Sequence, residues 1–169
     1  MDAAEVICNV DNDLGFDVMD EMETLVDNSL LLQSQDADGQ TRFTMLETIR
    51  EYAHERLLQS NEIDQIRRQH ALYFLEFARK VEPLVRSRER VKYTRKMRQE
   101  FGNIRAILEW NCSTGKSVEL GQRLAITLAW FWQSSMSISE SHQWAVRLME
   151  HVDDSTPLDI HAGLLWGLG

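Results

Sequence analysis

A short alternating run passes directly into a helical pattern between Arg42 and Leu57, and this junction constrains the fold more than any other part of the chain. Apolar residues alternate with polar ones over residues 42–46, as they do in a half-buried β-strand. From residue 47 onward the apolar positions recur at the spacing of an α-helix instead. The sequence therefore predicts a strand over residues 42–46 that leads straight into a helix over residues 47–59.

The residues upstream of this junction complete a compact unit. Apolar residues at helical spacing begin at Asp17 and are accompanied by acids near the start, which suit the positive end of a helix dipole. A short strand is predicted over residues 30–35, and the Asp-Gly pair ending residues 36–39 favours a tight turn. Helix, β-hairpin and helix within residues 17–60 predict the latter part of a winged helix. Residues 1–16 are acidic without periodicity, and we interpret them as a lead-in or an incomplete helix.

The remaining residues, 61–169, are predicted to be helical throughout. Gly (8 residues) and Pro (2 residues) are scarce, which favours helices over a sandwich or barrel. The fold class is therefore mainly α, with one small β-hairpin. The predicted helices cover residues 61–81, 89–112, 117–134, 138–151 and 157–168.

The tryptophans suggest an internal repeat. Trp110 and Trp144 are 34 residues apart, and so are Trp132 and Trp166. This is the period of the tetratricopeptide helix pair, so we expect a tetratricopeptide-like antiparallel helical array over residues 61–169. Each hairpin of such an array would bury its tryptophan against the next hairpin.

Charge is distributed unevenly along the chain. Residues 1–40 hold eleven of the 27 acidic side chains and no Lys or Arg, whereas residues 79–105 hold ten basic side chains against three acidic ones. Phosphate contact needs basic side chains, so the first forty residues do not suit DNA. The basic stretch is most simply a solvated helix face, although a helix over residues 86–98 could contact nucleic acid by itself.

No catalytic or metal-binding motif is complete. Gly115-Lys116-Ser117 ends like a Walker A motif, but Trp110 occupies the position of its first glycine and a helix is predicted to precede it. Cys8 and Cys112 are too few and too far apart for a disulfide framework. We expect no catalytic residue, metal or cofactor in this chain. No apolar run is long enough for a membrane span and no signal peptide is evident, so a cytoplasmic location without membrane contact is expected.

Three segments resemble a known family. Residues 45–53 (Met-Leu-Glu-Thr-Ile-Arg-Glu-Tyr-Ala), residues 70–74 (His-Ala-Leu-Tyr-Phe) and residues 100–110, which contain Asn-Ile-Arg-Ala, resemble bacterial signal-transduction ATPases of the STAND type. The closest group is the AfsR/LuxR-type transcriptional regulators, which are relatives of the NB-ARC ATPases. The resemblance covers about residues 17–150, and it implies that the chain is a segment of a larger regulator.

The resemblance also implies roles for residues. In the relatives the winged helix follows a nucleotide-binding domain, closes over bound ADP and holds the protein inactive. The corresponding latch positions here are Met45, Leu46, Glu47 and Arg50, with Leu46 in place of a histidine that would reach the phosphates. ATP or ADP is implied for the parent protein only, since this chain lacks Walker A and Walker B. The positions expected to support structure or interaction are His70, Asn103, Arg105, Trp110, Trp132 and Trp144.

Three functions follow as hypotheses. The leading one is a non-catalytic regulatory segment, whose winged helix latches onto an upstream nucleotide-binding domain and whose helices sense a protein or small-molecule inducer. Self-association through the helical array is also open. The alternative is a DNA-binding winged helix, which often reads the major groove. An enzyme built on a helical scaffold is the third, and no motif supports it.

Overall fold

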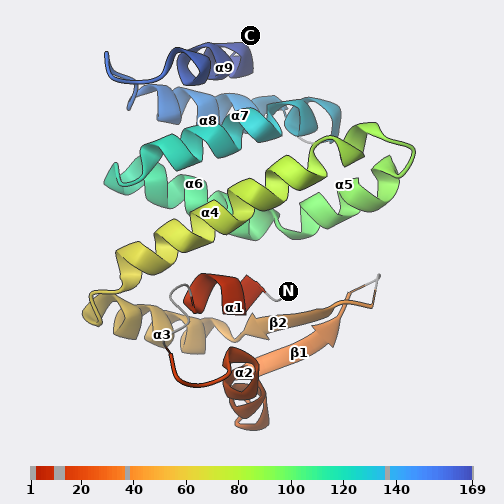
Figure 1. Cartoon of the computed structure of the whole chain (residues 1–169), viewed down its shortest axis with the longest axis vertical. Coiled ribbons are helices and arrows are strands. Elements are labelled where there is room, and N and C mark those ends of the chain that lie inside the picture. Colours follow the sequence, from red (N-terminus) through yellow and green to blue (C-terminus); the bar gives the residue numbers. More distant parts are fainter. Residues whose placement is uncertain (1–2, 10–13, 37–38, 136–137, 169) are drawn as a thin grey trace. The chain divides into compact units, whose positions relative to one another are not determined.

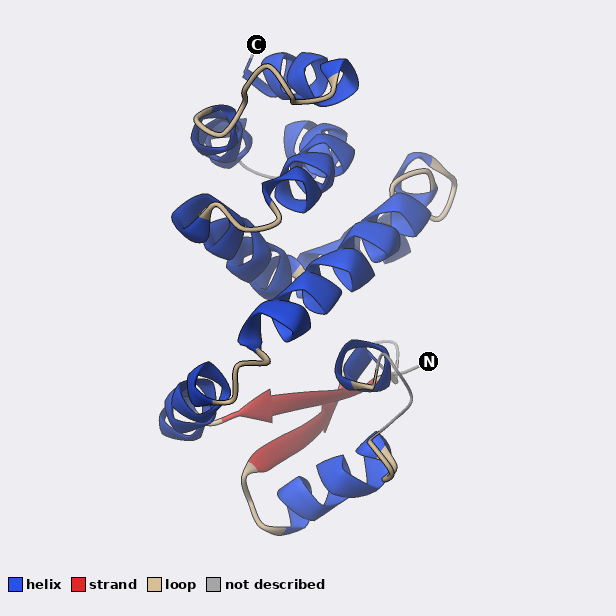
Figure 2. Cartoon of the chain, turned by 60° about the vertical axis from the view of Figure 1, so that its left-hand side comes forward, coloured by secondary structure: helices blue, strands red, loops and turns tan. Residues whose placement is uncertain are grey.

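The computed structural model describes residues 3–9, 14–36, 39–135 and 138–168, apart from the side chains of residues 133–135 (Figure 1). The chain divides into two compact units, Met1–Gln69 and His70–Gly169. Both units are rich in helix, and the described residues contain one pair of strands (Figure 2). The predicted class, mainly α with a single β-hairpin, is confirmed.

The first unit contains α1 (Ala3–Cys8), α2 (Val18–Asp27), the hairpin of β1 (Leu31–Gln35) and β2 (Thr41–Met45), and α3 (Glu47–Gln59). The strands pair antiparallel, with Leu31 opposite Met45 and Gln35 opposite Thr41. Only Leu46, which was predicted to end the strand, separates β2 from α3, and α3 covers the predicted residues 47–59. A helix, α1, occupies part of the segment interpreted as a lead-in or an incomplete helix.

Local chemistry sets the ends of α2 and of the hairpin turn. The side chain of Asp17 accepts the backbone N–H of Met19 over 2.7 Å and caps the start of α2. The turn predicted over residues 36–39 lies partly outside the described residues, because residues 37 and 38 are among those not described. Gly39 has φ +76° and donates its N–H to the carbonyl of Asp36, as expected of a glycine in a tight turn.

The second unit begins within α4 (Ile63–Val81) and continues through a short 3₁₀ helix, η1 (Leu84–Arg86). Packed helices follow, and α7 packs against α6, α8 and α9. No strand occurs among the described residues after β2. The bounds of these later helices are α5 (Arg90–Gln99), α6 (Phe101–Thr114), α7 (Val118–Ser135), α8 (Ile138–Met149) and α9 (Leu158–Leu168).

The single helix predicted over residues 89–112 is wrong, because two helices, α5 and α6, occupy that segment. The chain turns at Glu100, whose backbone has φ −92° and ψ 0° and whose N–H bonds back to Met97. Met97 and Phe101 flank the turn and are 0% and 4% exposed. A spacing of four residues between two apolar side chains fits one continuous helix, so the pattern could not reveal a turn that buries both.

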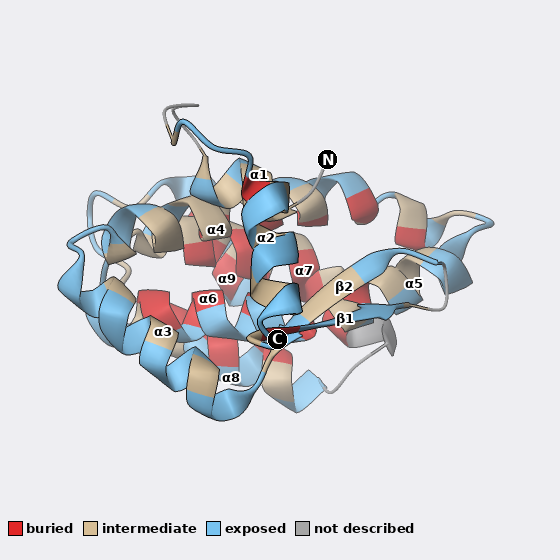
Figure 3. Cartoon of the chain, turned by 90° about the horizontal axis from the view of Figure 1, so that it is seen from below, coloured by how far each residue is buried: buried red, intermediate tan, exposed pale blue. Residues whose placement is uncertain are grey.

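The core of the second unit is built around aromatic rings. Phe101 stacks on Phe131 with 5.5 Å between ring centroids and meets the edge of Trp132 at 6.2 Å. Figure 3 shows buried residues in these helices, whereas α3 of the first unit has none. Among the described helices, none is both long enough and apolar enough to cross a membrane.

Candidate interaction surfaces

The helix that precedes the wing, α2, presents an acidic face. Asp20, Glu21, Glu23 and Asp27 are all exposed, and so is the capping residue Asp17. In DNA-reading helix-turn-helix domains, one helix enters the major groove between two rows of phosphates. Five exposed carboxylates on this helix would repel those phosphates, because binding there depends on releasing counterions to Lys and Arg.

The wing adds little positive charge. Arg42 is the only Lys or Arg in residues 31–45. Its Nε lies 3.8 Å from Oδ2 of Asp36, so a carboxylate offsets much of its charge. The helix and hairpin that would face DNA therefore carry more negative than positive charge, and they would not attract its phosphates.

The predicted latch positions lie at the start of α3. Leu46 is 50% exposed, and its carbonyl accepts the N–H of Arg50 over 2.8 Å. Glu47 and Arg50 are exposed and form an ion pair with each other. Met45 is half-buried opposite Leu31 in the hairpin. The exposed start of α3 thus holds Leu46, Glu47 and Arg50. Met45 is half-buried and precedes them at the end of β2.

The rest of α3 continues this surface. Every residue of α3 is described and none is buried. Tyr52 and Leu58 are 59% and 53% exposed, and Arg56 lies over the Tyr52 ring at 5.7 Å. An exposed helix that carries aromatic and aliphatic side chains among charges suits a protein contact.

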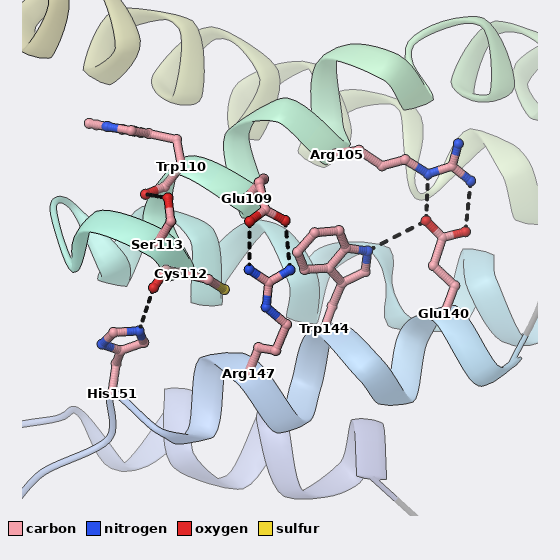
Figure 4. Close-up of polar contacts among 9 residues, drawn as sticks. All are labelled: Arg105, Glu109, Trp110, Cys112, Ser113, Glu140, Trp144, Arg147 and His151. Carbon is pink, nitrogen blue, oxygen red and sulfur yellow. Dashed lines mark hydrogen bonds and ion pairs between the residues drawn. The ribbon is translucent and has the colours of Figure 1, made fainter.

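A row of polar contacts joins α6 to α8, and we call it the hairpin seam (Figure 4). Arg105 makes a bidentate pair with Glu140, at 2.6 and 2.8 Å. Arg147 makes a second bidentate pair with Glu109, at 2.7 and 2.8 Å. Farther along, a ring nitrogen of His151 donates to a backbone carbonyl of α6, that of Cys112, over 3.1 Å.

Trp144 lies between the two ion pairs of the hairpin seam (Figure 4). Its indole N–H donates to Glu140 over 3.4 Å, and the guanidinium of Arg147 lies 4.8 Å from its ring. The hydrogen bond from Arg105, followed by that from Trp144, lowers the pKa of the Glu140 carboxyl. The hydrogen bond from Arg147 likewise lowers the pKa of Glu109. Both carboxylates are therefore held ionised below their ordinary range.

The other predicted tryptophans are packing residues. Trp132 is 1% exposed and belongs, with Trp144, to the main core cluster. Trp110 is also buried, although it lies outside that cluster. Trp166, which is 34 residues after Trp132, is 54% exposed. These burial values place the first three indoles in the interior rather than on a ligand-binding surface.

The remaining predicted positions, His70 and Asn103, lie near each other. Burial lowers the pKa of His70, and a hydrogen bond with Asn103 partly opposes that effect. The His70 ring meets the edge of Phe74 at 4.9 Å, and Asn103 donates to Glu100 over 2.9 Å. His70 is thus a half-buried, hydrogen-bonded packing residue whose neutral form is favoured by burial.

The sequence pattern missed most of the hairpin seam. Arg105 and Trp144 are among the positions predicted to support structure or interaction, whereas the ion pair between Glu109 and Arg147 was not predicted. The signal is present, because the seam partners lie 35, 38 and 39 residues apart, close to the 34-residue interval between tryptophans. Opposite charges near the repeat interval would have indicated these pairs.

The structure offers no catalytic arrangement in the part of the chain that it describes. No group of three or more His, Cys, Asp or Glu side chains could hold a metal ion within residues 3–9, 14–36, 39–135 and 138–168. Burial raises the pKa of the thiols of Cys8 and Cys112, which makes both poor nucleophiles.

Sequence comparison agrees with this fold. Residues 1–58 match the family described as a winged helix-turn-helix domain, so the first unit is a winged-helix domain. The match begins at residue 1 and includes α1. The chain is also similar to proteins named "Putative HTH-type transcriptional regulator" from Mycobacterium bovis and Mycobacterium tuberculosis.

These relatives are much longer than this chain. They are 32% identical over 136 residues, a span that covers 80% of this chain and 15% of each relative. No solved structure matches the chain significantly. The similarity supports a transcriptional regulator as the class of protein to which this segment is related.

Proposed function

We propose that this chain is a non-catalytic, protein-binding segment of a transcriptional regulator, in which the winged helix acts through protein contacts. The observation that carries the proposal is the acidic face of α2 beside a wing with a single, paired cation. A winged helix with this charge is suited to a basic protein surface and unsuited to phosphates. The similarity to proteins named as transcriptional regulators supports the regulatory part.

The finer proposal concerns the surface at the start of α3. We propose that the parent protein is a STAND-type ATPase and that Leu46, Glu47 and Arg50 form a latch on its upstream nucleotide-binding domain. Leucine cannot donate a hydrogen bond to phosphate, so Leu46 would contact protein and leave ATP or ADP to the other domain. The exposure of Leu46, at 50%, and of its charged neighbours Glu47 and Arg50 supports this role.

The helical unit would supply the sensing part. Residues 61–169 are proposed to form the beginning of a tetratricopeptide-like array that binds a protein or small-molecule inducer. The hairpin seam supports the idea, because it joins α6 to α8 at intervals close to the tryptophan repeat. Repeat arrays of this kind commonly present extended binding surfaces.

The latch is tested by reversing one charge in the parent protein. Arg50→Glu should change basal nucleotide hydrolysis or oligomeric state, because it inverts the charge in the middle of the proposed contact. Arg68→Glu is the matched control, since Arg68 is also exposed and lies outside that surface. Equal behaviour of Arg50→Glu and the unmodified parent would contradict the latch.

The second candidate is a DNA-binding winged helix, which the description of the matching family favours. A duplex titration of this chain at several salt concentrations distinguishes the two. If the wing binds DNA, Arg42→Gln should weaken that binding. The number of counterions released on binding, measured from the salt dependence of the affinity, should then fall by about one. We expect Arg42→Gln to leave any duplex affinity unchanged.

A further inference from the structure

The second unit contains an open groove between α5 and α7 that none of the roles above uses. Its volume is about 530 Å³. Apolar and basic side chains line it together with Thr94, and we call it the basic groove. The apolar set, which we call the floor, is Val85, Val91 and Trp130, and the basic set, which we call the rim, is Arg90, Arg95 and Arg98.

The rim belongs to the most basic part of the chain. Residues 86–98 hold seven Lys or Arg residues and one acid, whereas the whole chain has a net charge of −9. Only one side of α5 is packed inward, where Met97 is 0% exposed. The exposed cations of α5 are Arg90, Lys92, Arg95 and Arg98, whereas Lys96 is half-buried.

The floor is already organised around Trp130. The guanidinium of Arg86 lies 4.5 Å from the Trp130 ring, and Glu82 pairs with Arg86 from the preceding turn. A second hollow of about 290 Å³ adjoins Trp130 and is also lined by Trp166. The stacked arginine holds this indole in place before a ligand binds. Binding would therefore cost little further conformational entropy at Trp130.

We propose that the basic groove binds an acidic, amphipathic segment of a protein partner. Carboxylates of the segment would pair with Arg90 and Arg98, whose planar guanidinium groups suit bidentate carboxylate contacts. An apolar side chain between them would rest on Val91, which is 67% exposed, and on Trp130. This inference rests on the proposed function, because it names the class of partner that the helical unit would sense.

The apolar floor is what favours a peptide over nucleic acid. A duplex would approach the cations from outside and leave Val91 and Trp130 in water. An acidic peptide with an apolar anchor fills both parts of the groove, which is how Arg clusters recognise acidic motifs. Charge and shape therefore agree on the same occupant.

A labelled synthetic peptide tests the proposal. Its sequence is that of residues 16–28, chosen because it carries five acids and apolar side chains at helical spacing. Fluorescence anisotropy at low salt should show binding to the whole chain. Binding should weaken about tenfold in the double variant Arg90→Gln/Arg98→Gln, since two exposed ion pairs are lost.

Two controls separate the groove from general charge. The variant Arg68→Gln/Lys116→Gln removes the same charge from exposed positions outside the groove and should bind the peptide normally. A peptide with its acids replaced by amides should not bind. Val91→Asp should also weaken binding, because it places a carboxylate on the apolar floor.

The proposal is overturned by equal peptide affinity in the two double variants, or by absence of peptide binding. It is also overturned if duplex DNA binds, loses affinity in Arg90→Gln/Arg98→Gln and the peptide does not bind, since the groove would then serve nucleic acid. None of these results bears on the latch, which is tested separately at Arg50 in the parent protein.

Discussion

Gly121 is the position where one added methyl group tests the packing of the second unit most directly. A Cβ atom there would lie 2.7 Å from Oδ1 of Asn111 and 3.0 Å from its Cβ and Cγ. Asn111 is 0% exposed, and its amide donates to the carbonyls of Lys116 and Ser117 over 2.8 and 3.1 Å. It therefore cannot withdraw without loosening the bonds that close the turn between α6 and α7.

Three effects decide the outcome of Gly121→Ala. Alanine in place of glycine inside a helix stabilises by about 1 kcal/mol. An extra methyl group in a filled core costs about 1–3 kcal/mol, and a loosened hydrogen bond costs about 1 kcal/mol. Steric and hydrogen-bonding costs exceed the helix preference. We therefore expect the free energy of unfolding to fall by about 2 kcal/mol.

Tryptophan fluorescence during urea unfolding measures this change, because all five tryptophans lie in the second unit. Gly102→Ala is the control: no atom lies within 4 Å of its added methyl, so it should stabilise by about 0.5 kcal/mol. Combining Gly121→Ala with Asn111→Ala should remove the conflicts with Oδ1 and Cγ and leave the contact with Cβ, so the double-mutant cycle should show coupling of about 1 kcal/mol. A Gly121→Ala chain as stable as the unmodified one would refute the reasoning.

Three further outcomes are expected. Arg105→Gln should lower the free energy of unfolding by about 0.5 kcal/mol at pH 7, because its ion pair with Glu140 is partly exposed. The stabilisation that follows from the lowered pKa of Glu140 is present above the ordinary pKa and is lost as the pH falls through the lowered one. Urea titrations from pH 7 to pH 3 should therefore show the Arg105→Gln deficit disappearing in acid. Trp132→Ala should cost about 3–5 kcal/mol and Trp166→Ala under about 1 kcal/mol in the same assay, since the first indole is buried and the second is half exposed. Asp17→Ala should destabilise α2 by about 1 kcal/mol through loss of its N-cap, which thermal unfolding followed by circular dichroism would detect; an unchanged midpoint would contradict the capping role.

The sequence predicted those elements whose local signals agree with one another. The strand that leads into α3 was predicted because the apolar period changes from two to 3.6 at a single residue. Gly115 lies between the helices predicted over residues 89–112 and 117–134, and with φ +68° it ends α6 in the left-handed conformation. The turn at Glu100 was missed because no glycine or proline marks it, and its cause is tertiary burial on both sides.

The interaction surfaces were predicted less completely. The family resemblance implied that Leu46 and Arg50 are latch positions, and both side chains are exposed in the structure. The basic stretch was noted as a charge run, but only packing shows that α5 and Trp130 enclose a groove. Pairing across the hairpin seam depends on how α6 lies beside α8, and the spacing of opposite charges near the repeat interval indicates that register only approximately.

The hairpin seam gives the second unit an uneven response to salt. Its two ion pairs are partly exposed, so a rise in ionic strength weakens their attraction modestly, whereas the ring contacts around Phe101 carry no net charge to be screened. The packing of α6 on α8 therefore combines a salt-dependent charged edge with apolar contacts that electrostatic screening does not reach.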